Sequence, residues 1–347
     1  MKKYLNNNIF FQGDARIFSL LIGLFVGTYT VLEITLESSL YNNYDFMLYT
    51  NYGKENMESP LGFLGVFILL IFLVISFVLI CGMFKRKKWA TLLSGPFSRM
   101  DIRRRELVLM IGCVIGFILM FLLVWIRYSV SNDILVSYIN GFWGLIVIDI
   151  VRIIFISLAT ISILFLIDSL TSNMYITLVS LFAIGSYSLA GLLTIKISFL
   201  WPYNGGINET AKFIDEILYE ILLGEELHIY TYKFLISLLI LILITIICTI
   251  ITKKLTLKIK IENMGDAFIF SIIRKIVPIL LSTLIGMVVG MIIFNWVLFS
   301  GEFEIALNEI THPLMSFGII IIISIIAYII IQSTIKVLKN KIPKKYI

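Results

Sequence analysis

Eight long, mainly apolar runs, each of 20 residues or more, constrain this 347-residue chain more than any other feature. An α-helix needs about 20 mainly apolar residues to cross the hydrocarbon layer of a bilayer, which is ~30 Å thick. The runs are continuously apolar rather than alternating, so helices are expected and not the strands of a barrel. They fall at residues 16–36, 61–83, 107–127, 142–167, 174–195, 233–252, 276–299 and 314–336. The predicted fold class is all-α, a polytopic integral membrane protein with about eight transmembrane helices.

The overall composition agrees with this class. Hydrophobic residues make up 59% of the chain and charged residues 14%, against about 25% charged in ordinary soluble domains. No small-residue cleavage site follows the first apolar run, so we expect that span to be retained. The three cysteines, Cys81, Cys113 and Cys248, all fall inside predicted spans and form no Cys-x-x-Cys. They are expected to be small core-facing or lipid-facing residues, without disulfides or metal.

The distribution of positive charge predicts the orientation in the membrane. Lys and Arg in short loops near the ends of spans mark the cytoplasmic side. With the N-terminus inside, 22 of the 28 Lys and Arg lie in cytoplasmic segments, 5 lie in outer loops and Arg152 lies within a span. Both termini are therefore predicted to be cytoplasmic, although the turn at 171–173 has no basic residue and is placed by the number of crossings alone. The net charge of +6 suits topology and anionic lipid headgroups, and no nucleic-acid partner is expected.

Catalytic and nucleotide-binding motifs are absent from the sequence. There is no Gly-x-x-x-x-Gly-Lys-Ser/Thr, and the single Gly-Lys pair, Gly53 and Lys54, is followed by Glu55. His228 and His312 are the only histidines, and no His-Glu-x-x-His occurs. The chain is thus not expected to bind ATP by that loop, to be an enzyme, or to carry catalytic residues, a metal or a cofactor.

One pair of charges lies well inside a predicted span. Asp149 and Arg152 are three residues apart in the fourth run, so they share a helix face and can pair. A charge at the bilayer centre costs at least ~2.5 kcal/mol. Two interpretations stay open: an ion pair that only makes Arg152 tolerable, or a polar surface on a transport path or at a subunit interface. Glu33 and Asp168 are further acids near the ends of spans.

Small residues suggest where helices pack in the membrane, because they let backbones approach closely. Three Gly-x-x-x-Gly pairs are expected to form such packing seams: Gly23 and Gly27, Gly112 and Gly116, and Gly286 and Gly290.

The largest predicted outer loop, residues 201–232, contains six acids and one lysine. Asn208 is a suitable N-cap for a helix with one apolar face. We expect either a surface amphipathic helix or a gate over a pathway.

The segment at residues 84–106, between the second and third runs, has eight Lys and Arg. Trp89, Leu92 and Leu93 fall on one face of a short helix, which the Gly95-Pro96 dipeptide ends.

A second helix follows this turn directly. Ser98 has Asp101 three residues later, a spacing like that of a capping box, and predicts a helix from Arg99 into the third span. The segment therefore forms a cationic elbow with Phe97 and the apolar face available for docking. The alternative is a basic loop that serves topology alone.

The stretch LLSGPFSRMDIRRREL at residues 92–107 resembles a segment of the permease subunits of ABC-2 type ATP-binding-cassette transporters. In that family a Gly-Pro-x-Ser-Arg segment and a basic helix follow the second span. The resemblance implies that the elbow is received by a separate ATPase. The implied ATPase-coupling residues are Trp89, Leu92, Leu93, Pro96, Phe97, Arg99 and Arg103.

The resemblance also implies the domain organisation. Residues 1–252 look like a six-span permease core with extracellular helices within 201–232. Residues 253–347 would add a cytoplasmic linker and two further transmembrane helices, as in one branch of the family.

The expected function is that of a permease subunit, an exporter that forms half of a translocation pathway in a bacterial plasma membrane. Its expected partners are an ABC ATPase subunit, a second copy or a sibling permease, and the lipid bilayer. The alternative is an ATP-independent polytopic protein, either a secondary transporter or a membrane scaffold. Secondary transporters often contain inverted repeats, and none is evident here. The substrate and the choice between homodimer and heterodimer stay open.

Overall fold

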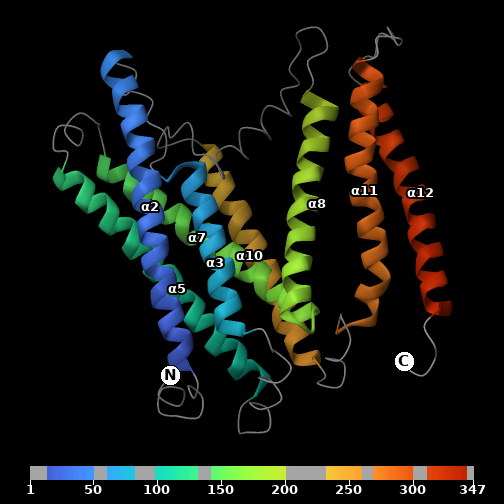
Figure 1. The fold of residues 1–347 in the computed structure, drawn as a ribbon, viewed down its shortest axis with the longest axis horizontal. Helices are drawn as coiled ribbons and strands as arrows, with labels where there is room; N and C mark the ends of the chain where they lie inside the picture. The colour runs from blue at the N-terminus through green and yellow to red at the C-terminus, as the bar shows by residue number, and fades with distance from the viewer. Residues whose placement is uncertain are drawn as a thin grey trace. The chain divides into compact units, whose positions relative to one another are not determined.

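A computed structural model describes residues 14–50, 61–82, 98–131, 142–200, 232–259, 269–299 and 311–341. These residues form helices and contain no strand (Figure 1). The helices are α2 (Asp14–Thr50), α3 (Gly62–Cys81), α5 (Arg99–Ser131), α7 (Phe142–Leu170), α8 (Met174–Leu200), α10 (Tyr232–Lys258), α11 (Ser271–Phe299) and α12 (Thr311–Lys341). The predicted all-α class is confirmed.

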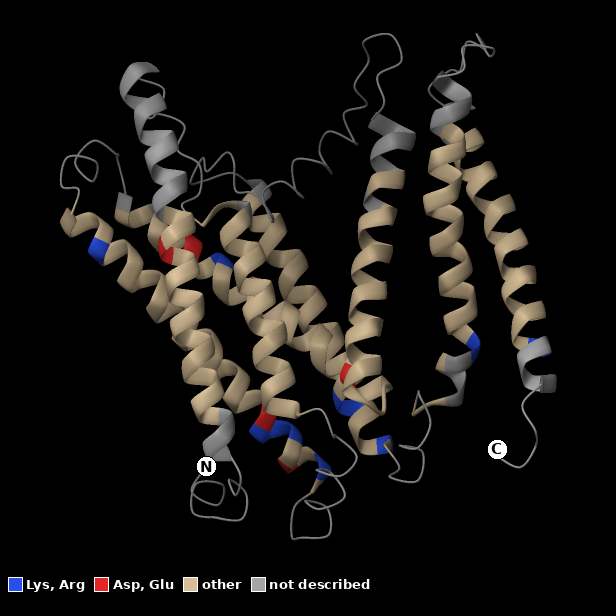
Figure 2. Cartoon of the chain, in the orientation of Figure 1, with Lys and Arg blue, Asp and Glu red and all other residues tan. Residues whose placement is uncertain are grey.

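Each of these eight helices is long and apolar enough to cross a membrane. Figure 2 shows most of their length without charge, with Lys, Arg, Asp and Glu gathered mainly near helix ends. This pattern follows from the cost of placing a charge in hydrocarbon. The described chain is thus a polytopic all-α membrane protein.

Several helices extend beyond the apolar runs that predicted them. Helix α2 continues past residue 36 to Thr50, and α10 continues past residue 252 to Lys258. Hydropathy marks only the part of a helix that needs an apolar environment, whereas backbone hydrogen bonds continue into polar sequence.

The chain divides into two compact units. The first consists of Met1–Thr177 and Glu216–Ala267, and the second of Leu178–Asp215 and Phe268–Ile347. Helix α8 from Leu178 onward belongs to the second unit, together with α11 and α12. The six-span permease core stays a prediction of the family resemblance.

Aromatic rings join three helices in the first unit. The Phe72 ring of α3 lies 5.3 Å from that of Phe25 on α2 and 5.4 Å from that of Phe117 on α5. Phe72 and Phe117 are fully buried. A Cβ at Gly116 would collide with the Phe25 ring, so the glycine lets α2 and α5 meet without displacing that ring.

Glycines also determine the packing of α11 against α12 in the second unit. A Cβ at Gly286 would lie 2.9 Å from the Ile320 carbonyl oxygen, and a Cβ at Gly290 would lie 2.8 Å from Ile320 Cγ1. Helix α8 adds a contact in which the Thr194 hydroxyl donates to the Met291 sulfur at 3.5 Å.

The predicted glycine seams are therefore confirmed at the C-terminal pair and at Gly116. At Gly23, Gly27 and Gly112 an added Cβ would meet no atom of the described chain within 4 Å. The part of the chain that the structure describes supplies no partner at these three positions, so the expected seam stays a prediction there.

Candidate functional site

The described part of the elbow begins at Ser98, and the site is built from this residue upward. The end of the first unit that contains Ser98 is called the inner end, following the predicted orientation. Trp89, Leu92, Leu93, Pro96 and Phe97 lie outside the described residues, so their coupling role stays a prediction.

Ser98 and Asp101 form the predicted capping box at the start of α5. The Asp101 N–H donates to Ser98 Oγ at 3.2 Å, and the Ser98 N–H donates to Asp101 Oδ2 at 3.0 Å. Two donors that a helix start leaves without partners are thereby satisfied. The elbow therefore passes into α5 at a defined residue.

Arg99 connects this start to another helix. Its Nη1 donates to the Leu257 carbonyl oxygen at 2.9 Å, near the end of α10 at Lys258. The last carbonyl groups of a helix lack partners within it and carry partial negative charge, so a cation is favourable there. Arg99 thus ties the inner ends of α5 and α10 together.

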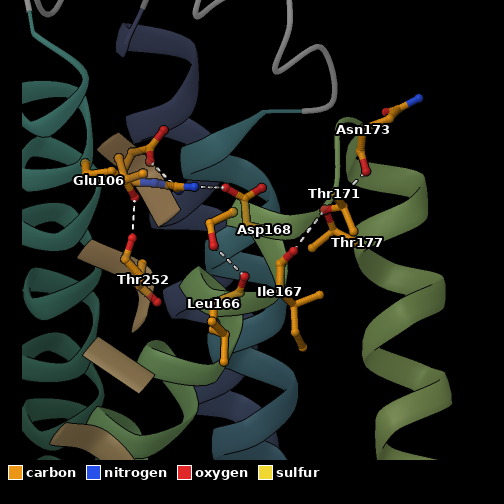
Figure 3. Close-up of polar contacts among 11 residues, drawn as sticks. Glu106, Leu166, Ile167, Asp168, Thr171, Asn173, Thr177 and Thr252 are labelled. Atoms are coloured by element: carbon orange, nitrogen blue, oxygen red, sulfur yellow. Dashed lines mark hydrogen bonds and ion pairs between the residues drawn. The ribbon is translucent and has the colours of Figure 1, made fainter. Parts of the chain in front are cut away.

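Arg103 is buried, with 6% of its surface exposed, whereas the resemblance implies a contact for a partner. Its Nη1 donates to Glu106 Oε2 at 3.0 Å, and its Nη2 lies 2.5 Å from Asp168 Oδ2 on α7. Figure 3 shows Glu106 and Asp168 on neighbouring helices at this end of the first unit. We name Arg103, Glu106 and Asp168 the inner ion cluster.

An aromatic ring lies against the inner ion cluster. The guanidinium carbon of Arg103 lies 5.3 Å from the centroid of the Phe165 ring on α7, a distance suited to cation–π attraction. Phe165 in turn meets Phe77 of α3 edge to face, with centroids 5.5 Å apart. Arg103 therefore joins α5 directly to α7 and, through one ring, to α3.

A buried polar turn follows the inner ion cluster along the chain (Figure 3). The hydroxyls of Thr171 and Thr177 lie 2.6 Å apart. Thr171 also donates to the Ile167 carbonyl oxygen and Thr177 to that of Asn173. The turn at 171–173, which the sequence leaves without a basic residue, is thus next to the buried Arg103–Asp168 pair.

The second cluster lies toward the other end of α7. Arg152 Nη1 donates to Asp149 Oδ1 at 3.0 Å, which confirms the predicted pair. The Leu61 N–H, at the start of α3, donates to Asp149 Oδ2 at 2.9 Å. The Asp149 and Arg152 side chains are at most 3% exposed. We name Asp149 and Arg152 the outer ion cluster; its geometry favours a structural pair over a solvated surface.

A third ion pair joins α2 to α5 at the surface. Arg127 pairs with Glu33, and their side chains are 66% and 27% exposed. Glu33 is one of the acids that the sequence places near the end of a span.

Sequence reasoning missed Glu106 and the partner of Asp168. The spacing of Arg103 and Glu106, three residues apart, was a usable signal. The Arg103–Asp168 pair had none, because it depends on α5 and α7 being neighbours.

Within the described ranges, no group of three or more His, Cys, Asp or Glu residues is placed to hold a metal ion. No protein-family model, curated protein or solved structure matches this chain. The fold and the site thus describe an all-α polytopic membrane protein whose first unit contains two buried ion clusters.

Proposed function

We propose that this chain is the permease subunit of an ABC-2 type transporter. It forms half of an export pathway, with a second copy or a sibling permease, in a bacterial plasma membrane. ATP is hydrolysed by a separate cytoplasmic ATPase that receives the elbow at residues 84–106.

The observation that carries the proposal is the continuity of α5. The helix runs for 33 residues from Arg99 to Ser131 without a break, about 50 Å at the rise of an α-helix. It starts at Arg99, directly after the capping residue Ser98 and three positions after Pro96. A displacement of Ser98 would therefore be passed along α5 into the membrane without a break in the helix.

The coupling step needs contacts that differ between two states of the ATPase, because a ligand shifts an equilibrium only by differential binding. ATP-driven closure of the ATPase would displace the apolar face of Trp89, Leu92 and Leu93. The start of α5 follows because Ser98 and Arg99 connect it to the elbow.

The test is co-purification of the chain with an ATPase encoded beside it. Changing Leu92 and Leu93 to Asp places charge on the docking face, and we expect the ATPase to be lost. Thr91→Asp is the matched control, because residue 91 lies on the opposite face of the predicted helix, and its complex should persist.

Retention of the ATPase by the double variant would contradict the elbow as its docking site. A wild-type chain that binds no ATPase and moves solute by an ion gradient would support the ATP-independent alternative.

A further inference from the structure

Helix α7 has buried charges near both ends and none between them. Asp149 and Arg152 lie toward its outer end and Asp168 toward its inner end, while residues 153–167 have no charge. Asp149 and Asp168 are 19 positions apart, about 28 Å along an α-helix. This span approaches the ~30 Å thickness of the hydrocarbon layer. The two ion clusters are thus separated along α7 by nearly the thickness of that layer.

The inner ion cluster holds α7 to α5. Arg103 and Asp168 are both buried, with side chains 7% and 1% exposed. Arg103 and Glu106 both lie on α5 and would stay paired, so separating the helices would part the Asp168 carboxylate from the Arg103 guanidinium. Parting a buried pair in an environment that solvates charge poorly is strongly destabilising. Helices α5 and α7 therefore resist moving apart at this end.

The outer ion cluster holds α7 to α3. Asp149 uses one oxygen for Arg152 and the other for the Leu61 N–H at the start of α3. A carboxylate at a helix N-terminus is favourable because the first N–H groups lack partners within the helix. The start of α3 is therefore bound to α7, not only packed against it.

We propose that α7 is a rigid link that holds α3 and α5 as one body and delivers displacement of the start of α5 to the outer end of α3. Arg103 is then a positioning residue inside this body and not a contact for the ATPase. The direction of this transmission rests on the proposed function, whereas the linkage of the three helices does not.

A double-mutant cycle tests the linkage without any partner. Arg103→Gln and Asp168→Asn should each lower the thermal unfolding midpoint of the purified protein. Together they should lower it by clearly less than the sum, because the two residues act as one unit. Arg104→Gln is the matched control, since Arg104 is one residue away and exposed, and should leave the midpoint unchanged. Additive losses from the two buried variants would overturn the linkage.

A distance measurement tests whether the body is rigid. Spin labels are placed at Arg104 on α5 and at the exposed Leu64 on α3, at the two ends of the body formed by α3, α5 and α7. Labelled chain is diluted in unlabelled chain, so that only distances within one chain are measured. In the complex with the ATPase, their separation should be the same with and without ATP. Arg103→Gln should broaden or shift the distribution, and Arg103→Lys, which keeps the charge, should restore it. A wild-type separation that changes with ATP would overturn the proposal.

ATPase binding separates the two proposals. Arg103→Gln should keep the ATPase, unlike the double Asp variant of Leu92 and Leu93. Loss of the ATPase from a folded Arg103→Gln protein would overturn the positioning role and make Arg103 a docking contact. If the wild-type chain binds no ATPase, the proposed function fails, and the double-mutant cycle alone still decides the linkage.

Discussion

Burial decides how much each ion pair matters in this chain. Asp149 and Arg152 are shielded from water, and the Asp149 carboxylate also accepts a backbone N–H from α3. Arg127 and Glu33 make a pair of the same type, but Arg127 is two-thirds exposed. Removing one partner of a buried pair leaves an isolated charge in a poorly solvating environment, whereas water solvates an exposed residue directly.

We expect Arg152→Leu to lower the free energy of unfolding by about 3–5 kcal/mol, the usual cost of breaking a buried pair. Adding Asp149→Asn should recover part of the loss, because the remaining buried charge is removed while an amide oxygen still accepts the Leu61 N–H. Unfolding of the purified protein in detergent measures both effects. Arg127→Leu is the control and should show no measurable change. An Arg152→Leu protein with unaltered folding and activity would contradict both interpretations of the pair.

At the scale of the helix, identical glycine spacings have different consequences. Gly286 and Gly290 face α12 at distances that exclude a side chain, whereas Gly23 and Gly27 show the same spacing and meet no described atom. The spacing places two glycines on one helix face, and the neighbouring helix decides whether that face is occupied.

Gly286→Val should therefore destabilise the α11–α12 pair, by about 1–3 kcal/mol as is typical of overpacking. Gly318→Val on α12 is the matched control, because a Cβ there meets nothing within 4 Å. This control measures the effect of placing a β-branched residue in a helix without a clash against a neighbouring helix. Thermal unfolding and limited proteolysis of the purified variants compare the two. Equal losses would show that valine itself, and not the contact with Ile320 and Ser324, causes the change.

For the whole molecule, the number of crossings and the charge distribution together predict the orientation. If all eight helices of the described chain cross the membrane, both termini lie on the same side, and the excess of Lys and Arg in the predicted inner segments predicts that this side is the cytoplasm. The two ends of α5 offer the sharpest test, since one continuous helix connects Arg104 to Ser131 and both residues are exposed.

In a background with the three native cysteines replaced by Ala, Arg104→Cys should react with a membrane-impermeant thiol reagent only after the cells are permeabilised. Ser131→Cys should react in intact cells. Labelling of the two positions from the same side would contradict a crossing by α5, and the reverse pattern would place the elbow outside, away from any cytoplasmic ATPase.

Local features of the structure followed from the sequence, because their cause lies within one short segment. The eight apolar runs predicted the eight helices, the spacing of Ser98 and Asp101 predicted the start of α5, and the spacing of Asp149 and Arg152 predicted their pair. Each of these predictions depends on the helical repeat or on the cost of placing polar residues in a bilayer. Both can be evaluated from residues that are close together along the chain.

Contacts between helices were decided by the tertiary structure alone. The burial of Arg103 against Asp168, and the bond from the Leu61 N–H to an aspartate 88 positions away, arise only when particular helices become neighbours. Hydropathy does not select those neighbours, because lipid chains are as apolar as the side chains they replace. Selection rests instead on close packing and on the few charges that must find a partner in the membrane.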